Sequence, residues 1–556
     1  MRVPSSLLLI ASAALAAACG GERSAASGST GGTVIVATPG DALSLFPPLV
    51  SDQVGRWVSD QIFDHLAEIG QDLSTVGDKG FTPRLARSWS WSADSLSIAF
   101  SIDPRARWHD GKPVTANDVR YSFMVFTDPK VGSPTASLLA NIDSISVRDS
   151  LTAVAWFKHR KPEQFYDLAY QLVVVPEHIY GSIAPDQLHT SDVTRHPVGS
   201  GRFRLEKWDA GTRISLVADT ANYRGRPKLD RVIFTPMDPA GAAAAVLTGQ
   251  LDVMDNFPFA QLPRLDSSTV ARPVVYAQLA YAFAAMNANA RKSSTAPHPI
   301  FSDKRVRRAL SMAVDRVAML RNVFGDKGRL NHGPFPMTLA VADSTTKVPP
   351  YDTVAANALL DSAGWRRGPD GMRARAGQPL RFTIATSAPS IPRNAYAVLM
   401  QEAFRRVGAR ADIERLEPNA MNDRVTHGDF DMVLLSFGTD PSPTDTKQFW
   451  ATSAIGPTGQ NYYHYSNRAA DALMDSLAMT GDPVKSRAYA SRAFKTIVDD
   501  VPAIWLYDGV AIEAVNGRIT TAPMRADEWW ANLADWSIAA DKRIDRDRIG
   551  LTPAKP

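Results

Sequence analysis

Residues 232–254, VIFTPMDPAGAAAAVLTGQLDVM, contain a strand, a helix and a second strand in direct succession. The apolar, β-branched start predicts the first strand. Asp238 is a good N-cap residue, and Pro239 falls at the first helical position, where its missing N–H is harmless. Gly249 ends the helix, and residues 251–254 begin the next strand. Strands that alternate with helices predict α/β layers.

The same order of elements recurs along the chain. Apolar runs or period-two alternation predict strands at 34–37, 96–102, 203–205, 411–416, 431–438 and 503–507. Helices are expected from Thr115, from Ser302/Asp303 to about Val317, at 354–363, at 394–407 and from Asp482 to about Val498. Thr115 with Asp118 three residues later is similar to a capping box. No internal repeat at a fixed period is present.

Length and composition bound the class of protein. The chain has 556 residues, so two or three domains are expected. Hydrophobic residues are 45% and charged residues 21%, which excludes a disordered or polytopic membrane chain. The net charge of +4 is spread without a Lys/Arg block, so nucleic-acid binding is not expected.

The one cysteine, Cys19, lies at the end of an N-terminal apolar run. It excludes an intrachain disulfide and a Cys-based metal site. The run at 7–17 is too short to span a bilayer and predicts a secretory signal, residues 1–18. LAAAC at 15–19 resembles a bacterial lipobox, which implies lipid on the Cys19 sulfur, followed by a Gly/Ser tether at 19–32. The alternative is a signal peptide that happens to contain a cysteine.

Motifs of catalytic and metal sites are absent from the sequence. It contains no nucleophile elbow, phosphate loop, dinucleotide fingerprint or HExxH motif. The histidines have no i, i+3 or i, i+4 spacing that a helical metal site would need. Residues 199–201, Gly-Ser-Gly, are interpreted as a turn before a strand. We therefore predict no catalytic residue, no metal and no cofactor, and a protein that is not an enzyme.

An ordered set of segments resembles a known family. These segments are 83–89 (PRLARSW), 108–119 (WHDGKPVTANDV), 197–203 (PVGSGRF), 247–253 (LTGQLDV), 301–310 (FSDKRVRRAL), 351–365 and 461–467 (NYYHYSN). The set is similar to bacterial extracellular solute-binding proteins of the dipeptide/oligopeptide/nickel class, the capture subunits of ABC importers. The segment 108–119 supplies a tight turn and a capped helix, so we interpret it as scaffold.

The resemblance implies an α/β, two-lobed periplasmic-binding-protein fold (type II-like) with an extra domain inserted in lobe 1 and a hinge between the lobes. The expected ranges are 33–72, 195–284 and 508–556 for domain I, 73–194 for domain II, and 285–507 for domain III. The hinge crossings are expected near 284–287 and 507–509. Such a hinge lets two lobes close on a ligand.

The segment 431–440, DMVLLSFGTD, is predicted to be a buried strand that ends in polar residues. Relatives that bind peptides have an aspartate just after this strand, three residues past an aromatic, and it pairs with the peptide's amino terminus. Phe437 and Asp440 hold these two positions, with phenylalanine in place of the commoner tryptophan and with Pro441 following at once. Helix capping or a surface turn is the alternative role of Asp440.

Other residues are candidates for the walls of the cleft, with core packing as the alternative role of each. They are Asp255 and Asn256 after a strand, Tyr281 and Phe283 near the hinge, Phe46 after the first strand, and Trp450.

The resemblance implies a monomeric, lipid-anchored substrate-binding subunit of an ABC importer, at the periplasmic or external face of the cell envelope, that captures short peptides. Its partners would be a permease and ATPase complex and the membrane that holds the anchor. A binder of an oligosaccharide or a metal chelate is the alternative within the class. A surface hydrolase and a sensing lipoprotein without transport are the alternatives from other classes.

Overall fold

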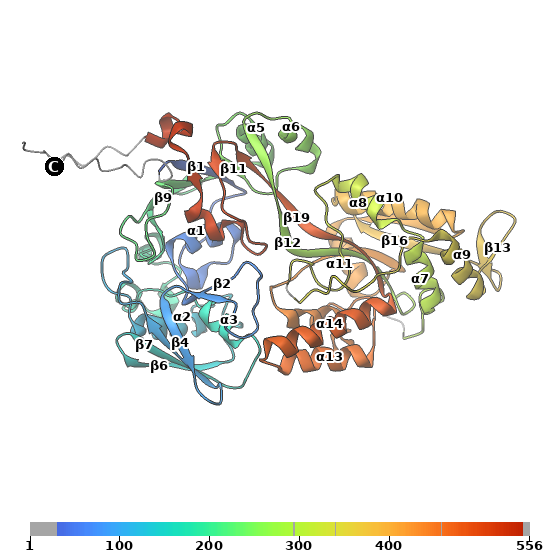
Figure 1. The fold of residues 1–556 in the computed structure, drawn as a ribbon, viewed down its shortest axis with the longest axis horizontal. Coiled ribbons are helices and arrows are strands. Elements are labelled where there is room, and N and C mark those ends of the chain that lie inside the picture. The colour runs from blue at the N-terminus through green and yellow to red at the C-terminus, as the bar shows by residue number, and fades with distance from the viewer. Residues whose placement is uncertain (1–30, 293–294, 340, 457–458, 549–556) are drawn as a thin grey trace, which may run out of the picture.

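The computed structural model describes residues 31–292, 295–339, 341–456 and 459–548. The predicted signal peptide and Cys19 lie outside these residues. Figure 1 shows two bodies joined by the long strands β12 and β19, with the blue-to-green N-terminal part forming one body and the yellow-to-orange part the other.

A ten-stranded sheet runs through both bodies. Its strands, in spatial order, are β17 (Arg410–Leu416), β16 (Arg381–Ser387), β18 (Met432–Gly438), β12 (Ala271–Met286), β19 (Ala503–Asn516), β11 (Val253–Met254), β1 (Thr33–Thr38), β10 (Arg231–Pro236), β9 (Arg213–Ala218) and β8 (Phe203–Asp209). Because strands from both bodies share this sheet, the backbone hydrogen bonds are continuous across the junction.

The junction lies where the pairing of β12 with β19 changes register. Ala271–Ala277 pair with the end of β19 that also contacts β11, whereas Ala280–Met286 pair with β18 in the other body. The pairing shifts between Ala277 and Tyr281, opposite Asp508. The second expected crossing, 507–509, lies at this shift. The first expected crossing, 284–287, lies beyond this shift, at the end of the segment of β12 that pairs with β18. The domain ranges stay a prediction.

Helices cover the sheet in each body. The N-terminal body has α1 (Gln53–Ile62), α5 (Pro239–Leu247) and α6 (Leu262–Asp266). The other body has α7 (Lys304–Met312), α8 (Arg316–Phe324), α9 (Thr353–Ser362), α10 (Ile391–Arg406), α11 (Pro418–Thr426), α12 (Thr446–Trp450), α13 (Arg468–Met479) and α14 (Pro483–Asp500). Separate buried apolar clusters lie under α5 and under α7 to α10.

A second, four-stranded antiparallel sheet belongs to the segment between β1 and β8. Its strands are, in order, β4 (Ala86–Trp91), β5 (Ser97–Ile102), β7 (Thr152–Phe157) and β6 (Ile142–Asp149), with α2 (Ala116–Thr127), α3 (Gln164–Ala169) and α4 (Glu177–Tyr180) nearby. The shorter strands are β2 (Ala67–Ile69), β3 (Phe81–Pro83), β13 (Arg366–Arg367), β14 (Arg373–Arg375), β15 (Gln378–Pro379), β20 (Ile519–Thr520) and β21 (Ser537–Ile538).

The local signals of the sequence explain several elements. The strand–helix–strand unit is β10, α5 and β11, and the Asp238 carboxylate accepts hydrogen bonds from the Ala240 and Gly241 N–H groups at 3.1 and 3.0 Å. β1 lies parallel between β10 and β11. The Thr115 N–H donates to Asp118 at 2.8 Å, so aspartate completes the reciprocal bond of the capping box. The prediction of α/β layers is confirmed.

Two local predictions differ from the structure. The segment 302–317 is not one helix, because Asp315 caps a second helix through the Ala318 N–H at 2.9 Å; Val317 is therefore 54% exposed on α8. The predicted tether reaches Gly32, yet the Gly31 N–H donates to the Lys228 carbonyl at 2.6 Å and both glycines are buried. The ordered body thus includes the last two residues of that range.

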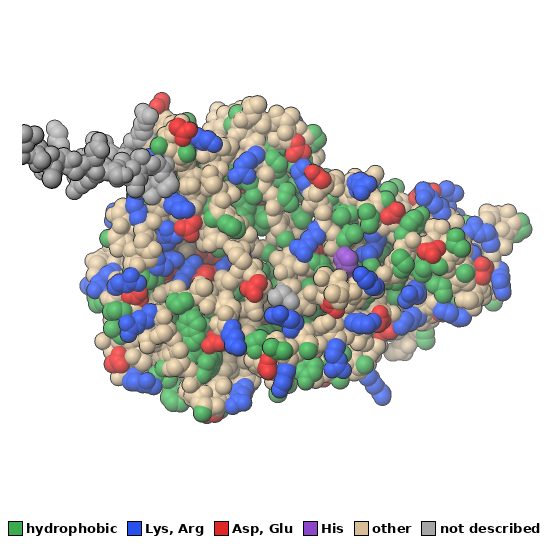
Figure 2. All heavy atoms as spheres, in the orientation of Figure 1, with side chains coloured by type: hydrophobic (Ala, Val, Ile, Leu, Met, Phe, Trp, Pro, Cys, Tyr) green, Lys and Arg blue, Asp and Glu red, His purple; other side chains and the backbone are tan. Residues whose placement is uncertain are grey.

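No helix among the described residues is long and apolar enough to cross a bilayer. Figure 2 shows Lys/Arg and Asp/Glu side chains interspersed over the visible face, without a continuous basic surface.

Candidate functional site

A cavity of about 420 Å³ lies at the junction of the two bodies, in the size range of small-ligand sites. It is lined by parts of the segments 47–60, 126–135, 166–173, 255–256, 276–280, 439–441 and 526–530. These segments come from both bodies and from β12 at its register shift. A wider groove of about 710 Å³ between 77–79 and α13–α14 contains none of the predicted site residues.

Three of the predicted residues line the cavity: Asp255, Asn256 and Asp440. Asp440 follows β18 and is exposed; its carboxylate accepts no hydrogen bond from any described residue. The helix that follows is capped by other residues, since Ser442 caps the turn at 443–445 and α12 begins after Asp445. Asp440 therefore caps no helix, and its carboxylate is available to a ligand.

Asp445 lies directly behind Asp440 and responds to its charge. The Asp440 backbone N–H donates to Asp445 Oδ2 at 3.2 Å. Burial, followed by the charges of Asp440 and Glu163, raises the pKa of Asp445 to about 7. The carboxyl groups at this end of the cavity thus repel one another, so a cation here would be stabilised.

Five predicted residues lie in the core instead of on the cavity wall. Tyr281, Phe283, Phe437 and Trp450 form one aromatic cluster, in which the Trp450 indole N–H donates to the Tyr281 hydroxyl at 2.9 Å. Phe46 packs on Tyr180 with ring centroids 4.3 Å apart. Four of the five are fully buried and Phe437 is 8% exposed. All five are thus packed in the core, which was the alternative role given for Phe46, Tyr281, Phe283 and Trp450.

The wall formed by α1 carries a cation that sequence reasoning did not identify. The guanidinium of Arg56 has no hydrogen bond or ion pair with any described residue. Burial lowers its pKa, but the charges of Asp60 and Glu528 outweigh this effect and raise it. Asp60 accepts a hydrogen bond from the Trp530 indole at 2.8 Å, and burial raises its pKa to about 6. Arg56 is thus a free cation on a wall that is otherwise acidic.

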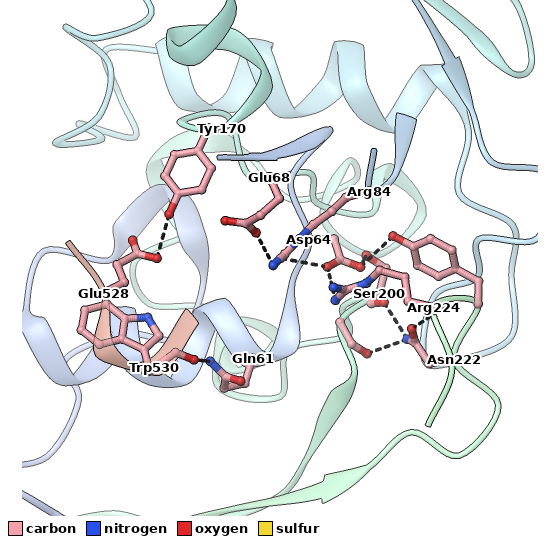
Figure 3. Close-up of polar contacts among 12 residues, drawn as sticks. Gln61, Asp64, Glu68, Arg84, Tyr170, Ser200, Asn222, Arg224, Glu528 and Trp530 are labelled. Carbon is pink, nitrogen blue, oxygen red and sulfur yellow. Dashed lines mark hydrogen bonds and ion pairs between the residues drawn. The ribbon is translucent and has the colours of Figure 1, made fainter. Parts of the chain in front are cut away.

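Buried ion pairs and hydrogen bonds support the part of the wall that adjoins α1, and Figure 3 shows several of them. The Tyr170 hydroxyl donates to Glu528 Oε2 at 2.7 Å, and Arg525, 3% exposed on its side chain, pairs with Glu528 at 2.9 Å. Arg525 also contacts Glu68, which pairs with Arg84.

The same network continues away from the cavity through Asp64. Its carboxylate, 0% exposed, lies 3.6 Å from Arg84, and it accepts hydrogen bonds from Arg224 at 2.6 Å and from the Tyr223 hydroxyl at 3.0 Å. Because breaking a buried pair leaves an uncompensated charge, this network holds Tyr170 and Glu528 in fixed positions.

Contacts between the two bodies close one side of the cavity. The Ser442 and Thr444 hydroxyls donate to Glu163, and the Thr444 bonds are 3.1 and 3.2 Å. The Thr75 hydroxyl donates to the Pro441 carbonyl at 3.0 Å. The structure therefore has the bodies in contact beside Asp440.

Sequence reasoning missed Arg56, Asp60, Tyr170 and Glu528. Nothing in the local pattern around Arg56, Asp60 or Tyr170 distinguishes them from other residues of a helix or loop. The run Asp-Glu-Trp-Trp at 527–530 was a usable signal, because adjacent acids and aromatics outside a strand are typical of a binding surface.

Comparison with known proteins places the chain among characterised relatives. The model of bacterial extracellular solute-binding proteins, family 5 Middle, matches residues 80–457. The oligopeptide-binding protein AppA of Bacillus subtilis is 24% identical over 485 residues, 86% of each chain. Protein XP55 of Streptomyces lividans is 28% identical over 506 residues, 88% of this chain and 87% of the relative.

Solved structures share the fold. AppA of Bacillus subtilis in complex with a nonapeptide superposes with a TM-score of 0.64 at 23% identity, covering 92% of this chain and 100% of AppA. NikZ of Campylobacter jejuni in complex with Ni(L-His) superposes with a TM-score of 0.67 at 22% identity, covering 91% of this chain and 99% of NikZ.

Proposed function

Because this chain belongs to family 5 of the bacterial extracellular solute-binding proteins, we propose that it is the substrate-binding component of an ABC importer that captures short peptides in the cavity between its two lobes. The family predicted from the ordered segments is confirmed, and so is the α/β periplasmic-binding-protein fold. Binding and release, and not chemistry on the solute, are the activities that this family membership supports.

The observation that carries the peptide assignment is the free carboxylate of Asp440 in that cavity. A peptide's amino terminus is a cation that loses its water when the lobes close, so it needs a carboxylate within hydrogen-bonding distance. Asp440 has no competing partner, and the neighbouring Asp445 increases the negative potential. We assign Asp440 the role of binding the amino terminus.

Arg56 provides the complementary charge. Its guanidinium, which has no hydrogen bond or ion pair with any described residue, lines the same cavity. A guanidinium can bind a carboxylate in a bidentate geometry. We assign it to a carboxylate of the peptide, either the carboxyl terminus or an acidic side chain. A zwitterionic ligand would then have one partner for each of its charges.

Asp440→Asn tests the assignment, since it keeps the shape of the side chain and removes its charge. Peptide binding should weaken by roughly ten- to a hundredfold, because charge-assisted hydrogen bonds contribute about 1.5–3 kcal/mol and each 1.4 kcal/mol is a factor of ten. N-acetylated peptides should bind the parent protein as weakly as free peptides bind the variant. Calorimetry with both peptides on both proteins measures this.

The same titrations separate the alternatives. A neutral oligosaccharide gains nothing from the charge, so its affinity would be the same for both proteins. A nickel–histidine chelate, the ligand class named for NikZ, is the third ligand to titrate. Equal affinities of free and acetylated peptides for both proteins would contradict the role of Asp440.

We further propose that the protein is a monomer held at the outer face of a membrane by lipid on Cys19, with domains at the ranges expected from the sequence. The LAAAC context and the Gly/Ser-rich segment after it support this anchor. Cys19→Ser should move the protein from the membrane fraction to the soluble fraction without changing its melting temperature. Retention in salt-washed membranes would contradict the anchor.

A further inference from the structure

A buried carboxyl group without a hydrogen-bond partner lies behind the cavity wall. Glu513 is in the middle of β19, opposite Val274 of β12, and is 0% exposed. Neither of its carboxyl oxygens is hydrogen-bonded within the described part of the chain. Buried polar groups are nearly always paired, because burial removes their water. An unpaired carboxyl group at this place therefore requires an explanation.

Asp255 on the cavity wall follows Met254, which pairs with Ala514 of β19, so Asp255 lies beside Glu513. Burial, followed by the charge of Asp255, raises the pKa of Glu513 well above its ordinary value. The Tyr276 hydroxyl donates to Asp255 Oδ1 at 3.4 Å, and burial together with both carboxyl groups raises the pKa of Tyr276. A second carboxylate beside a fully buried carboxyl group disfavours its ionisation, so Glu513 holds a proton.

The helices α5 and α6, which pack on the part of the sheet that carries Glu513, supply no compensating cation. α5, which packs on β19, has no titratable side chain. On α6, which packs on β12, Arg264 contacts Gln261 at 3.3 Å and Asp266 contacts Lys327 at 3.3 Å. Both charges of α6 therefore have partners other than Glu513.

The loop that carries Asp255 is held in place. Asn256 has a φ of +51°, a left-handed conformation that is uncommon outside glycine, and its side-chain amide donates to Asp255 Oδ2 at 2.9 Å. The Phe257 N–H donates to the Ile512 carbonyl of β19 at 2.8 Å. A carboxylate fixed in this way binds a ligand without a further cost of ordering.

The charges on the cavity wall favour a cation at this position. Asp527 and Glu528 are compensated by Arg525, at 2.6 and 2.9 Å, and Asp60 lies near Arg56. Asp255 has only neutral donors, the Asn256 amide and the Tyr276 hydroxyl. Its negative charge is therefore available to a ligand.

We propose that Asp255, supported by Glu513, binds a positively charged side chain of the ligand, the ammonium or guanidinium group of a basic peptide residue, at a position separate from Asp440. On binding, the O–H bond of Glu513 breaks, the proton passes to water and the buffer, and the ligand cation faces Asp255 with the ionised Glu513 behind it. This inference rests on the proposed function and narrows its substrates to peptides with a basic residue.

The test compares Ala-Ala-Ala with Ala-Lys-Ala by calorimetry in buffers of different ionisation enthalpy. The lysine peptide should bind at least about tenfold more tightly to the parent protein, equivalent to about 1.4 kcal/mol. Binding of the lysine peptide should also release up to about one proton more than binding of the alanine peptide. The proton release measured with the alanine peptide accounts for the amino terminus and for Asp445.

Two variants locate the effect. Asp255→Asn should abolish both the lysine preference and the extra proton. Glu513→Gln, which keeps the volume and can donate to Asp255, should abolish only the extra proton. Asp186→Asn is the control, because Asp186 does not line the cavity, and it should change neither measurement.

The outcomes distinguish this inference from the function on which it rests. Equal affinities of the two peptides for the parent protein would overturn the inference and leave peptide binding in place. A lysine preference without extra proton release would overturn the role of Glu513. Binding of neither peptide would contradict the proposed function itself. Because the first two comparisons use the parent protein, they decide the matter even if a variant fails to fold.

Discussion

At the scale of single residues, the polar side chains of the cavity differ in whether the protein has already paired them. Glu528 is held by Tyr170 and Arg525, so it belongs to the supporting network. The side chains of Asp440 and Arg56 have no hydrogen bond or ion pair with the described residues, although the charges of Asp60 and Glu528 act on Arg56. An unpaired charge is unfavourable where water is excluded. In a binding site it favours the binding of a ligand group of opposite charge.

The effect of an unfavourable charge can be measured at Asp445, through the pH dependence of the free energy of unfolding. Its pKa is raised from 3.8 to about 7 in the folded protein, so between pH 4 and 7 the folded state binds more protons than the unfolded state. Its contribution to the free energy of unfolding is therefore most favourable below pH 4, decreases as the pH rises, and is constant above about 7. Asp445→Asn should raise stability at pH 8 by about 1–3 kcal/mol relative to the parent protein and change it little at pH 4.

Chemical denaturation of both proteins at pH 4, 6 and 8 checks this prediction. A difference between parent and variant that does not change with pH would show that Asp445 titrates at its ordinary value. Asp186, exposed in the turn 185–187, is a control aspartate whose replacement by asparagine should not change the pH profile.

At the scale of elements, the segment 197–203 connects two parts of the N-terminal body through its backbone. The Gly201 N–H donates to the Ile62 carbonyl at the end of α1 at 2.8 Å, and the His109 N–H donates to the Gly199 carbonyl at 2.8 Å. His109 belongs to the segment 108–119, so two of the segments that resemble the family contact each other here. The turn predicted at 199–201 is a point of close backbone contact with α1.

Gly199→Ala should destabilise this contact strongly. A Cβ atom on Gly199 would lie 1.8 Å from the Ile62 carbonyl oxygen, so the segment would have to move away from α1. We expect a loss of about 2–3 kcal/mol or more in the free energy of unfolding, the range of overpacked buried sites.

Gly40→Ala is the matched control, because a Cβ there meets nothing within 4 Å. It should change stability by no more than about 0.5 kcal/mol. Urea denaturation of both variants measures the difference. Equal effects of the two substitutions would mean that the segment can shift without cost.

At the scale of the whole molecule, the two bodies share one sheet. Their relative orientation can therefore change only where the strand pairing is irregular. The register shift of β12 against β19 lies next to the cavity, since Gln278–Ala280 line it. A change of angle at this shift would open or close the cavity without breaking the core of either body. The contacts of Glu163 with Ser442 and Thr444 join the two bodies beside the cavity and would be lost if the bodies moved apart.

Ligand binding should therefore compact the protein, and Glu163 should contribute to it. We expect peptide to decrease the radius of gyration in solution scattering and to stabilise the protein by about 2.7 kcal/mol at a hundredfold excess over its Kd. Glu163→Gln should weaken binding by roughly tenfold, because part of a charged hydrogen bond is lost from the closed state only.

Glu177→Gln, on α4 of the same body, is the control, since Glu177 pairs only with Arg120 at 3.9 Å and has no contact with the other body within the described residues. It should bind peptide like the parent protein. A tightly bound peptide that leaves the radius of gyration unchanged would contradict closure.

The sequence alone determined the elements whose causes are local. Asp238, Thr115 with Asp118, and Asp482 each begin a helix at the predicted place, because a cap depends on residues within one turn. Gly364 likewise closes α9 with a φ of +84°. The α/β class and the family followed from such local patterns taken in order.

Only the tertiary structure decided which residues meet at the cavity. Tyr281 and Phe283 of β12 are packed against Trp450, Trp505 and Phe437, so aromatics that could have faced a ligand are part of the core. Arg56 and Tyr170 come from segments far apart in the chain and have no local signal, whereas Glu528 belongs to the run 527–530. Asp440 was predicted from the family resemblance, by its place three residues after Phe437, whereas the burial and the missing partner of Glu513 depend on β11 and β12 beside it. Local sequence sets the course of the backbone, but a side chain's partners depend on contacts between segments far apart in the chain.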